Sequence, residues 1–307
     1  MIVTDLSPVE LRHRLAAGQL RLRTGPLVAD IRSSEEAVAD GIARQYAQHP
    51  LARDDEFADF HVAVVRPANL RRWWRPQAFF LVDGLSLFNP LPADQAFPLL
   101  EWGLNWCIST HCQQYLMIHA AVVERNGGAL ILPAPPGSGK STLCAALVQR
   151  GWRLLSDELA IIDPPSGLLV AIPRPISLKN ASIDVIRDFA PDGVLNPPVH
   201  ETIKGTVSHL RPPAASVRAA DLPARPAWVA LPRYEAGSAT ELTALGKAQA
   251  LMQLAENAFN YSVHGRRGFE ILAALVDRAG CFNFRYSRLD EAIATFSRLA
   301  DDRGMPQ

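Results

Sequence analysis

The sequence predicts an α/β (α+β) protein whose mixed, partly antiparallel sheet carries a phosphate-binding loop. The apolar run at 129–132 has the length of a buried strand, and a Pro/Gly turn separates it from a helical run at 142–148. The turn Asn126-Gly127-Gly128 joins this strand to the apolar segment at 115–123 and has the composition of a tight hairpin. Because hairpin neighbours are antiparallel, we expect a mixed sheet and not a doubly wound parallel one.

The loop has the Gly-x-Gly-Lys-Ser composition of a P-loop between strand and helix. Gly137 and Gly139 allow successive backbone amides to point at one anion, and the helix N-terminus adds free N–H groups. Lys140 is expected to reach the β- and γ-phosphate oxygens, and the Ser141 hydroxyl to ligate Mg²⁺. The full pattern opens with Gly where this chain has Ala134, which the following proline biases toward extended geometry. The predicted nucleotide-binding residues are Pro136, Gly137, Ser138, Gly139, Lys140, Ser141 and Thr142.

The composition is that of an ordinary globular protein. The 307 residues are enough for a large core and about two domains. The formal net charge is zero, so no global field favours nucleic acid or an anionic membrane surface. No apolar run has the length of a membrane span, and the first residues lack the pattern of a signal peptide. The four cysteines form no CxxC pair and fit the reducing cytoplasm, where we expect the protein.

Residues 1–112 are predicted to form a separate α+β module that docks a substrate or partner, and residues 113–307 the P-loop domain. Ser7 is the expected N-cap of a short helix, with Pro8 as its first residue and Glu10 as the capping partner. Short alternating segments predict an antiparallel sheet, with Asp83-Gly84 as a hairpin turn. The predicted strands are 19–23, 27–31, 60–66, 78–82 and 85–88, and the predicted helices are 34–48 and 92–111.

The segment Arg71-Arg72-Trp73-Trp74-Arg75-Pro76 interleaves basic and aromatic residues. Such a pattern is typical of a loop whose tryptophans pack on a sheet while its arginines are solvated. It also fits contact with a protein or peptide, or stacking on single-stranded nucleic acid. The sequence favours the first of these interpretations.

Asp157 and Glu158 follow the P-loop helix at the end of a short apolar strand, as a Walker B-like element does. Neighbouring side chains of an extended chain point to opposite faces. Both carboxylates can therefore face the phosphates only if the chain turns between them. We expect one to serve the acceptor hydroxyl and the other to ligate Mg²⁺, directly or through water.

Three further basic residues are candidates for contacting phosphate, because a kinase without an external activator needs cations beside the transferred group. Arg174 and Lys179 lie in the segment that follows the next predicted strand. Lys204 lies beside a glycine in the segment 200–213, which is predicted to form a mobile loop over the nucleotide or substrate.

Three features stand in one order along the chain: a strand that contains His119, the P-loop after a hairpin, and Leu155-Ser156-Asp157-Glu158. In this the chain resembles the HPr kinase/phosphorylase family, and more closely its HprK-related kinase branch. The resemblance covers about residues 115–190 closely and continues loosely to residue 300. It implies a P-loop fold similar to phosphoenolpyruvate carboxykinase.

The resemblance also implies site roles. Lys140 and Ser141 would hold phosphate and Mg²⁺. Asp157 would be the catalytic carboxylate that takes the serine proton, and Glu158 a second acid near the metal. His119 matches a histidine that orients the catalytic acid. The sequence at 178–183 departs from the family's downstream Glu and Arg signature.

The expected function is that of an ATP- and Mg²⁺-dependent kinase that phosphorylates a serine of a protein or peptide. Two alternatives remain at this stage. One is a small-molecule kinase with the N-terminal module as its lid, and the other is a non-catalytic module whose partner affinity is switched by ATP. The intact acidic pair favours catalysis over binding alone.

Overall fold

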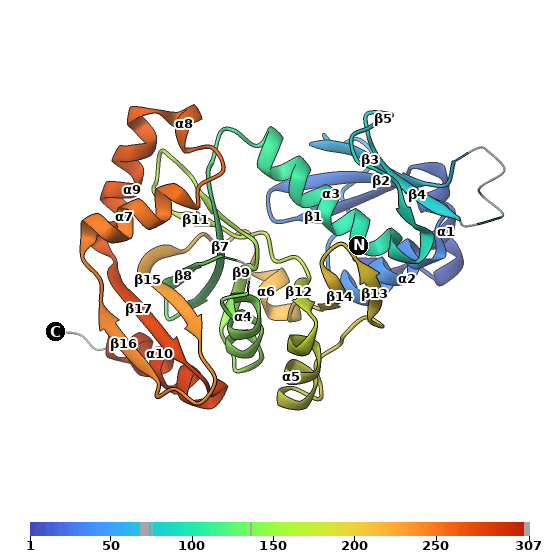
Figure 1. Cartoon of the computed structure of the whole chain (residues 1–307). Coiled ribbons are helices and arrows are strands. Elements are labelled where there is room, and N and C mark those ends of the chain that lie inside the picture. Colours follow the sequence, from blue (N-terminus) through green and yellow to red (C-terminus); the bar gives the residue numbers. More distant parts are fainter. Residues whose placement is uncertain (68–73, 75, 136, 304–307) are drawn as a thin grey trace.

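The structure, a computed structural model, describes residues 1–67, 74, 76–135 and 137–303. Figure 1 shows two parts side by side, a smaller N-terminal part in blue and teal and a larger C-terminal part from green to red. Each part is built on its own sheet, and both sheets mix parallel and antiparallel strand pairs. The predicted mixed α/β (α+β) class is confirmed at this level.

The N-terminal part places helices against a sheet with the order β1-β2-β3-β4-β5, and β6 pairs with β4. Its first long helix begins as predicted, because Ser7 Oγ accepts a hydrogen bond from Glu10 N and Pro8 is the first helical residue. The elements are η1 (Val3–Asp5), α1 (Pro8–Ala17), β1 (Leu20–Thr24), β2 (Leu27–Ser33), α2 (Glu36–Gln45), β3 (Phe60–Val65), β4 (Gln77–Val82), β5 (Leu85–Ser86), β6 (Leu91–Pro92), η3 (Ala93–Gln95) and α3 (Ala96–His111).

The prediction of an antiparallel N-terminal sheet is wrong for one pair. Strands β2 and β3 run parallel, with Ile31 opposite Val62. The helix α2 between them carries the chain back to the starting edge, and such a crossover makes the joined strands parallel. The predicted hairpin at Asp83-Gly84 is confirmed, with both residues at positive φ.

The C-terminal part is centred on a sheet with the order β11-β10-β7-β8-β15-β17-β16, and β9 also pairs with β7. A second sheet has the order β12-β14-β13. The elements are β7 (Leu116–Arg125), β8 (Gly128–Pro133), α4 (Lys140–Gln149), β9 (Arg153–Ser156), β10 (Leu159–Ile162), β11 (Leu169–Val170), β12 (Ile176–Lys179), α5 (Ala181–Phe189), β13 (Val199–Thr202), β14 (Gly205–Leu210), α6 (Ala214–Arg218), β15 (Arg225–Tyr234), β16 (Glu241–Ala244), α7 (Lys247–Glu256), α8 (Tyr261–His264), α9 (Arg266–Arg278), β17 (Gly280–Tyr286) and α10 (Leu289–Arg303).

The hairpin that feeds the P-loop strand is confirmed. Strands β7 and β8 are antiparallel neighbours, and Asn126 and Gly127 occupy the turn with φ of 55° and 76°. Two successive residues at positive φ match the right-handed twist of the flanking strands. On its other edge β8 pairs in parallel with β15, so the sheet is mixed at the P-loop itself.

Both faces of the large sheet are buried. Val123 and Leu132 face α4 and α10 in one apolar cluster, while Val122 and Ile131 face α7 and α9 in another. This alternation follows from the period of two along a strand. The P-loop strand is therefore held rigidly between two helical layers (Figure 1).

The apolar core of the N-terminal part continues across residue 112. It includes Met117, Leu159 and Ile161 of the large sheet, which pack with α1–α3 and β1–β4. The boundary that the sequence predicts thus separates two sheets but not two cores. This contact brings α3 up to the turn between β9 and β10.

Three other expectations concern segments outside the site. Most of the Arg71–Pro76 segment lies outside the described residues, and of its tryptophans only Trp74 is described, with 81% of its surface exposed. All four cysteines are buried and free. No helix in the described part of the chain combines the length and the apolar character that crossing a bilayer requires.

Candidate active site

The predicted P-loop lies between the end of β8 and the start of α4. Gly137 and Gly139 have φ of 86° and 90°, a region that residues with a Cβ rarely adopt. A Cβ on Gly139 would also lie 2.4 Å from Tyr286 Oη. Ala134 is not among the residues at positive φ, so the alanine at this position causes no backbone strain. Pro136 lies outside the described residues.

Lys140 is the first residue of α4 and is only 7% exposed. Its Nζ lies 3.1 Å from His119 Nε2, and the same ring nitrogen lies 3.1 Å from Glu158 Oε2. Lys140 Nζ and Glu158 Oε2 are 3.9 Å apart. The Nε2 atom cannot donate to the carboxylate and accept from the ammonium at once. A ligand that attracts Lys140 would leave His119 free to donate to Glu158.

The two predicted carboxylates occupy a turn that interrupts one strand. Strands β9 and β10 both pair with β7, and only Asp157 and Glu158 separate them. Leu159 N donates to Ser156 Oγ across this turn. The chain therefore turns at the acidic pair, as the prediction required for both side chains to serve one site.

Asp157 is the buried member of the pair, with 4% of its surface exposed. Its Oδ2 accepts from Ser177 N at 3.2 Å, and among the described residues its Oδ1 has no hydrogen-bond partner. Burial, followed by the charge of Glu158, raises the pKa of Asp157 to about 6, although Lys140 and the Ser141 hydroxyl act in the opposite direction. This leaves an unpaired carboxylate oxygen in the neighbourhood of the Ser141 hydroxyl.

Glu158 is the more accessible member, with 25% of its side chain exposed. Its burial would raise the pKa, but the hydrogen bond from His119 and the charge of Lys140 outweigh burial and lower the pKa to about 2. Glu158 is therefore a carboxylate at neutral pH. The resemblance assigned the histidine to the catalytic acid Asp157, but in the structure His119 contacts Glu158.

A cleft of about 830 Å³ opens over the P-loop. His119, Lys140, Ser141 and Glu158 line its floor. Its walls come from the P-loop, from the end of β12 and the length of α5, from the end of β15, and from the residues around the β17–α10 junction. These wall residues include Gly137, Ser138, Gly139, Thr142, Lys179, Asn180, Val185, Phe189, Tyr234, Tyr286, Arg288 and Leu289. The volume lies within the range of small-molecule and cofactor sites, and polar groups at the floor with aromatic groups on the walls suit a nucleotide.

The structure separates the three predicted basic residues. Lys179, at the end of β12, lines the cleft. Lys204, at the tip of the β13–β14 hairpin, places its Nζ 4.8 Å from the centre of the Trp102 ring. Both lie close enough to Glu158 to change its pKa or their own.

The prediction that Arg174 contacts phosphate does not hold in the structure, because its guanidinium is directed into the N-terminal part and not toward the P-loop. It forms a buried ion pair with Glu101 of α3 at 2.7 Å, donates to Asn105 Oδ1 at 2.6 Å and donates to Tyr46 Oη at 3.3 Å. All three guanidinium nitrogens are thus occupied. The sequence could not reveal this, because the partners lie 69 or more residues away along the chain.

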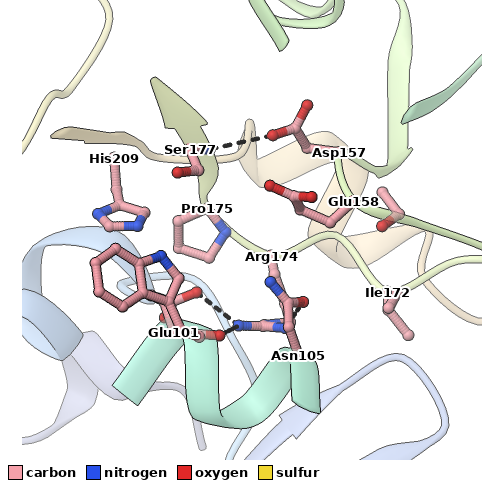
Figure 2. Close-up of a pocket in the computed structure, with 11 residues that line it drawn as sticks. Glu101, Asn105, Asp157, Glu158, Ile172, Arg174, Pro175, Ser177 and His209 are labelled. Atoms are coloured by element: carbon pink, nitrogen blue, oxygen red, sulfur yellow. Dashed lines mark hydrogen bonds and ion pairs between the residues drawn. The ribbon is translucent and has the colours of Figure 1, made fainter. Parts of the chain in front are cut away.

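A small polar cavity of about 20 Å³ lies between the acidic turn and α3, with room for about one water molecule. Figure 2 shows Asp157 and Glu158 on one side of it and Glu101 and Asn105 on the other. Two further lining side chains, Ser177 and His209, carry buried polar atoms without a partner in the described part of the chain, as does the half-buried Trp102. Sequence reasoning missed these residues, since no motif surrounds them.

A magnesium site fits the residues present. No cluster of three or more His, Cys, Asp and Glu side chains that could hold a metal occurs in the ranges that the structure describes. Mg²⁺ does not require one, since it keeps several waters and takes one or two carboxylates plus substrate phosphates. The unpaired Oδ1 of Asp157 and the Ser141 hydroxyl supply oxygen ligands of this kind.

Comparisons with known proteins do not establish a family. No protein-family model matches the chain, and no curated protein matches it significantly. The resemblance to the HPr kinase/phosphorylase family therefore remains a prediction from the motifs around His119, the P-loop and the acidic pair.

Proposed function

We propose that the protein is an ATP-dependent kinase that transfers the γ-phosphoryl group to the serine hydroxyl of a protein or peptide. One observation carries this proposal: Lys140, His119 and Glu158 contact one another on the floor of a cleft of nucleotide size. A plain nucleotide-binding loop requires the lysine but not the carboxylate–histidine pair. That pair has the composition of a proton acceptor and the group that orients it.

Separate groups of the chain would hold the phosphates and the metal. Amides of the loop at 137–141 and the Lys140 ammonium would hold the phosphates. Mg²⁺ would neutralise the developing charge on the β- and γ-phosphate oxygens. Ser141 and Asp157 would hold the metal, because Asp157 Oδ1 is the oxygen left without a partner among the described residues.

Glu158 is the proposed base, in place of Asp157. The acceptor oxygen attacks the γ-phosphorus, the bond from that phosphorus to the β–γ bridging oxygen breaks, and ADP leaves with the bond's electron pair. The hydroxyl proton passes to the Glu158 carboxylate, which His119 orients. When Lys140 turns to the phosphates, Glu158 loses a cationic neighbour and becomes more basic. Nucleotide binding would thus prepare the base.

The test is transfer of label from γ-labelled ATP with Mg²⁺ to a lysate of cells that contain the protein, depleted of small molecules. We expect a labelled protein band with the unaltered enzyme and none with Lys140→Ala. Glu158→Gln should lower the rate at saturating Mg²⁺ by on the order of 10²- to 10⁴-fold. Asp157→Asn should chiefly raise the Mg²⁺ requirement.

Near-normal transfer by Glu158→Gln would refute the base assignment. The absence of any labelled protein, with ATP binding intact, would favour a small-molecule kinase or an ATP-gated binding module. Circular dichroism of each variant provides the control for folding.

A further inference from the structure

The chain uses lysine very selectively. It has four lysines among 31 basic residues, and the others are arginines. Lys140, Lys179 and Lys204 all lie around Glu158. Lys140 and Lys179 lower the pKa of Glu158, and Glu158 raises the pKa of Lys204. The fourth, Lys247, donates to the carbonyls of Val276 and Ala279 and has a structural role. A compact ammonium suits an anion approached from a single point, whereas arginine presents a wide planar fork.

The β13–β14 hairpin holds Lys204 firmly beside Lys179. Asn180 N donates to Thr206 O at 2.9 Å, and Thr206 N donates back to Asn180 Oδ1 at 3.1 Å. Gly205, the first residue of β14, directly follows Lys204 and has φ of 83°. Asn180 directly follows Lys179 at the cleft wall. These hydrogen bonds join the backbone segments that carry the two lysines.

In the part of the chain that the structure describes, neither Lys179 nor Lys204 forms an ion pair. The Lys204 ammonium lies over the face of the Trp102 ring. Burial, followed by the charge of Lys179, lowers the pKa of Lys204. Two cations that share one nearby carboxylate, Glu158, without an ion pair to it among the described residues offer positive charge to an anion from solution. A cation–π contact at an exposed position is weak, so Lys204 can leave the ring for such an anion.

The two lysines approach Glu158 from the large cleft and from the side of α3. Lys179 lines the large cleft beside the P-loop, and Lys204 lies over the ring of Trp102, which lines the same small cavity as Asp157 and Glu158. A neutral hydroxyl contributes little binding energy, yet it must be held close to the γ-phosphorus to react. A second, charged group on the same acceptor would provide the binding energy that holds it there.

We infer that Lys179, at the wall of the cleft, and Lys204, over the Trp102 ring, bind an anionic group of the phosphoryl acceptor, which is therefore a hydroxyl compound with a carboxylate or phosphate near its hydroxyl. This inference rests on the proposed function, since it assumes that a hydroxyl is phosphorylated at Glu158. It narrows the acceptor from any serine to one with a neighbouring negative charge.

The test measures binding of inorganic phosphate by calorimetry to the full chain already saturated with Mg²⁺ and an ATP analogue that carries nitrogen at the β–γ bridge. The nucleotide site is then occupied, so phosphate reports on a second site. We expect saturable binding that Lys204→Gln weakens about tenfold or more, as the loss of a charged hydrogen bond does. Lys204→Arg, which keeps the charge but presents a wider fork, should bind phosphate more tightly than Lys204→Gln and less tightly than the unaltered chain. The matched control is Arg298→Gln, an exposed residue of α10 that should change nothing.

Competition then identifies the acceptor's source. Free L-serine, a peptide that ends in serine with a free carboxylate, and a peptide with phosphoserine beside serine are each tested for displacement of phosphate. Displacement by any of them supports the inference and names the class, and displacement by none overturns it. Equal phosphate affinity of Lys204→Gln and the unaltered chain, or no phosphate binding at all, also overturns it. Failure to bind the ATP analogue is a separate readout that removes the proposed function itself.

Discussion

His209 should make the protein sensitive to mild acid. It lies on β14 with 2% of its surface exposed, its ring edge-on to Phe97 at 5.3 Å between centroids. Burial lowers its pKa to about 4, although Glu101 and Glu158 act in the opposite direction, and Arg174 and Lys179 add to the lowering. An unfolded histidine has a pKa of about 6.5. Below that pH the unfolded chain therefore binds a proton that the folded chain does not.

The folded and unfolded pKa values of His209 set the sign and the size of its effect on stability. The folded pKa is depressed, so the stability is fully present above pH 6.5 and is lost as the pH falls toward 4. Between pH 7 and pH 5 the loss from this one histidine is about 2 kcal/mol. His49, whose pKa burial also lowers to about 4, adds a similar loss at the same interface. The raised pKa of Asp157 changes the pH dependence of stability in the opposite direction. This contribution is shared by the unaltered chain and the histidine variants compared below.

The assay is urea unfolding followed by tryptophan fluorescence at pH 7 and pH 5. We expect His209→Gln, which keeps a polar side chain but does not titrate, to lose about 2 kcal/mol less than the unaltered chain between these pH values. The exposed His13 serves as the control, and His13→Gln should leave the pH dependence unchanged. Parallel losses for His209→Gln and the unaltered chain would refute the reasoning from burial.

Three further substitutions test separate contacts. Arg174→Met should lower the free energy of unfolding by about 3–5 kcal/mol in a urea titration, because it leaves Glu101 buried and unpaired. The control, Arg187→Met at an exposed ion pair, should lower it by less than about 1 kcal/mol. Similar losses for the two variants would contradict the buried pairing. Gly139→Ala should abolish binding of a fluorescent ATP analogue, because its Cβ would lie 2.4 Å from Tyr286 Oη, and Gly246→Ala, which has open space, should not. Ser141→Ala should raise the Mg²⁺ concentration for half-maximal binding by about tenfold or more, and an unchanged titration would reject a metal ligand there.

Local sequence predicted the parts of this site that depend on local geometry. The Ser7 cap, the Asn126-Gly127 hairpin and the two glycines of the P-loop each require only a few neighbouring residues. For Asp157 and Glu158 the prediction was conditional, since both can face one site only if the chain turns between them, and the structure has that turn. Which member of the pair contacts His119 was not predictable, because it depends on which carboxylate the β7–β10 pairing brings next to that histidine.

Non-local pairing accounts for what the sequence did not predict. The parallel β2–β3 pair depends on where α2 packs, and the destination of Arg174 depends on Glu101 in a helix far upstream. The sequence around a basic residue such as Arg174 in a P-loop domain fits both a phosphate contact and a buried ion pair. Burial decides between them, and burial is a property of the whole fold.

The position of α3 links the N-terminal part to the chemistry. Glu101 fixes Arg174, and Trp102 of the same helix turn faces the cavity behind the acidic pair and carries Lys204 on its ring. The apolar core runs from this part into Met117 and the β10 strand that follows Glu158. Removing the N-terminal part would expose that core and would also open the small cavity behind the acidic pair. The module that the sequence set apart as a docking unit is, by these contacts, a wall of the candidate active site.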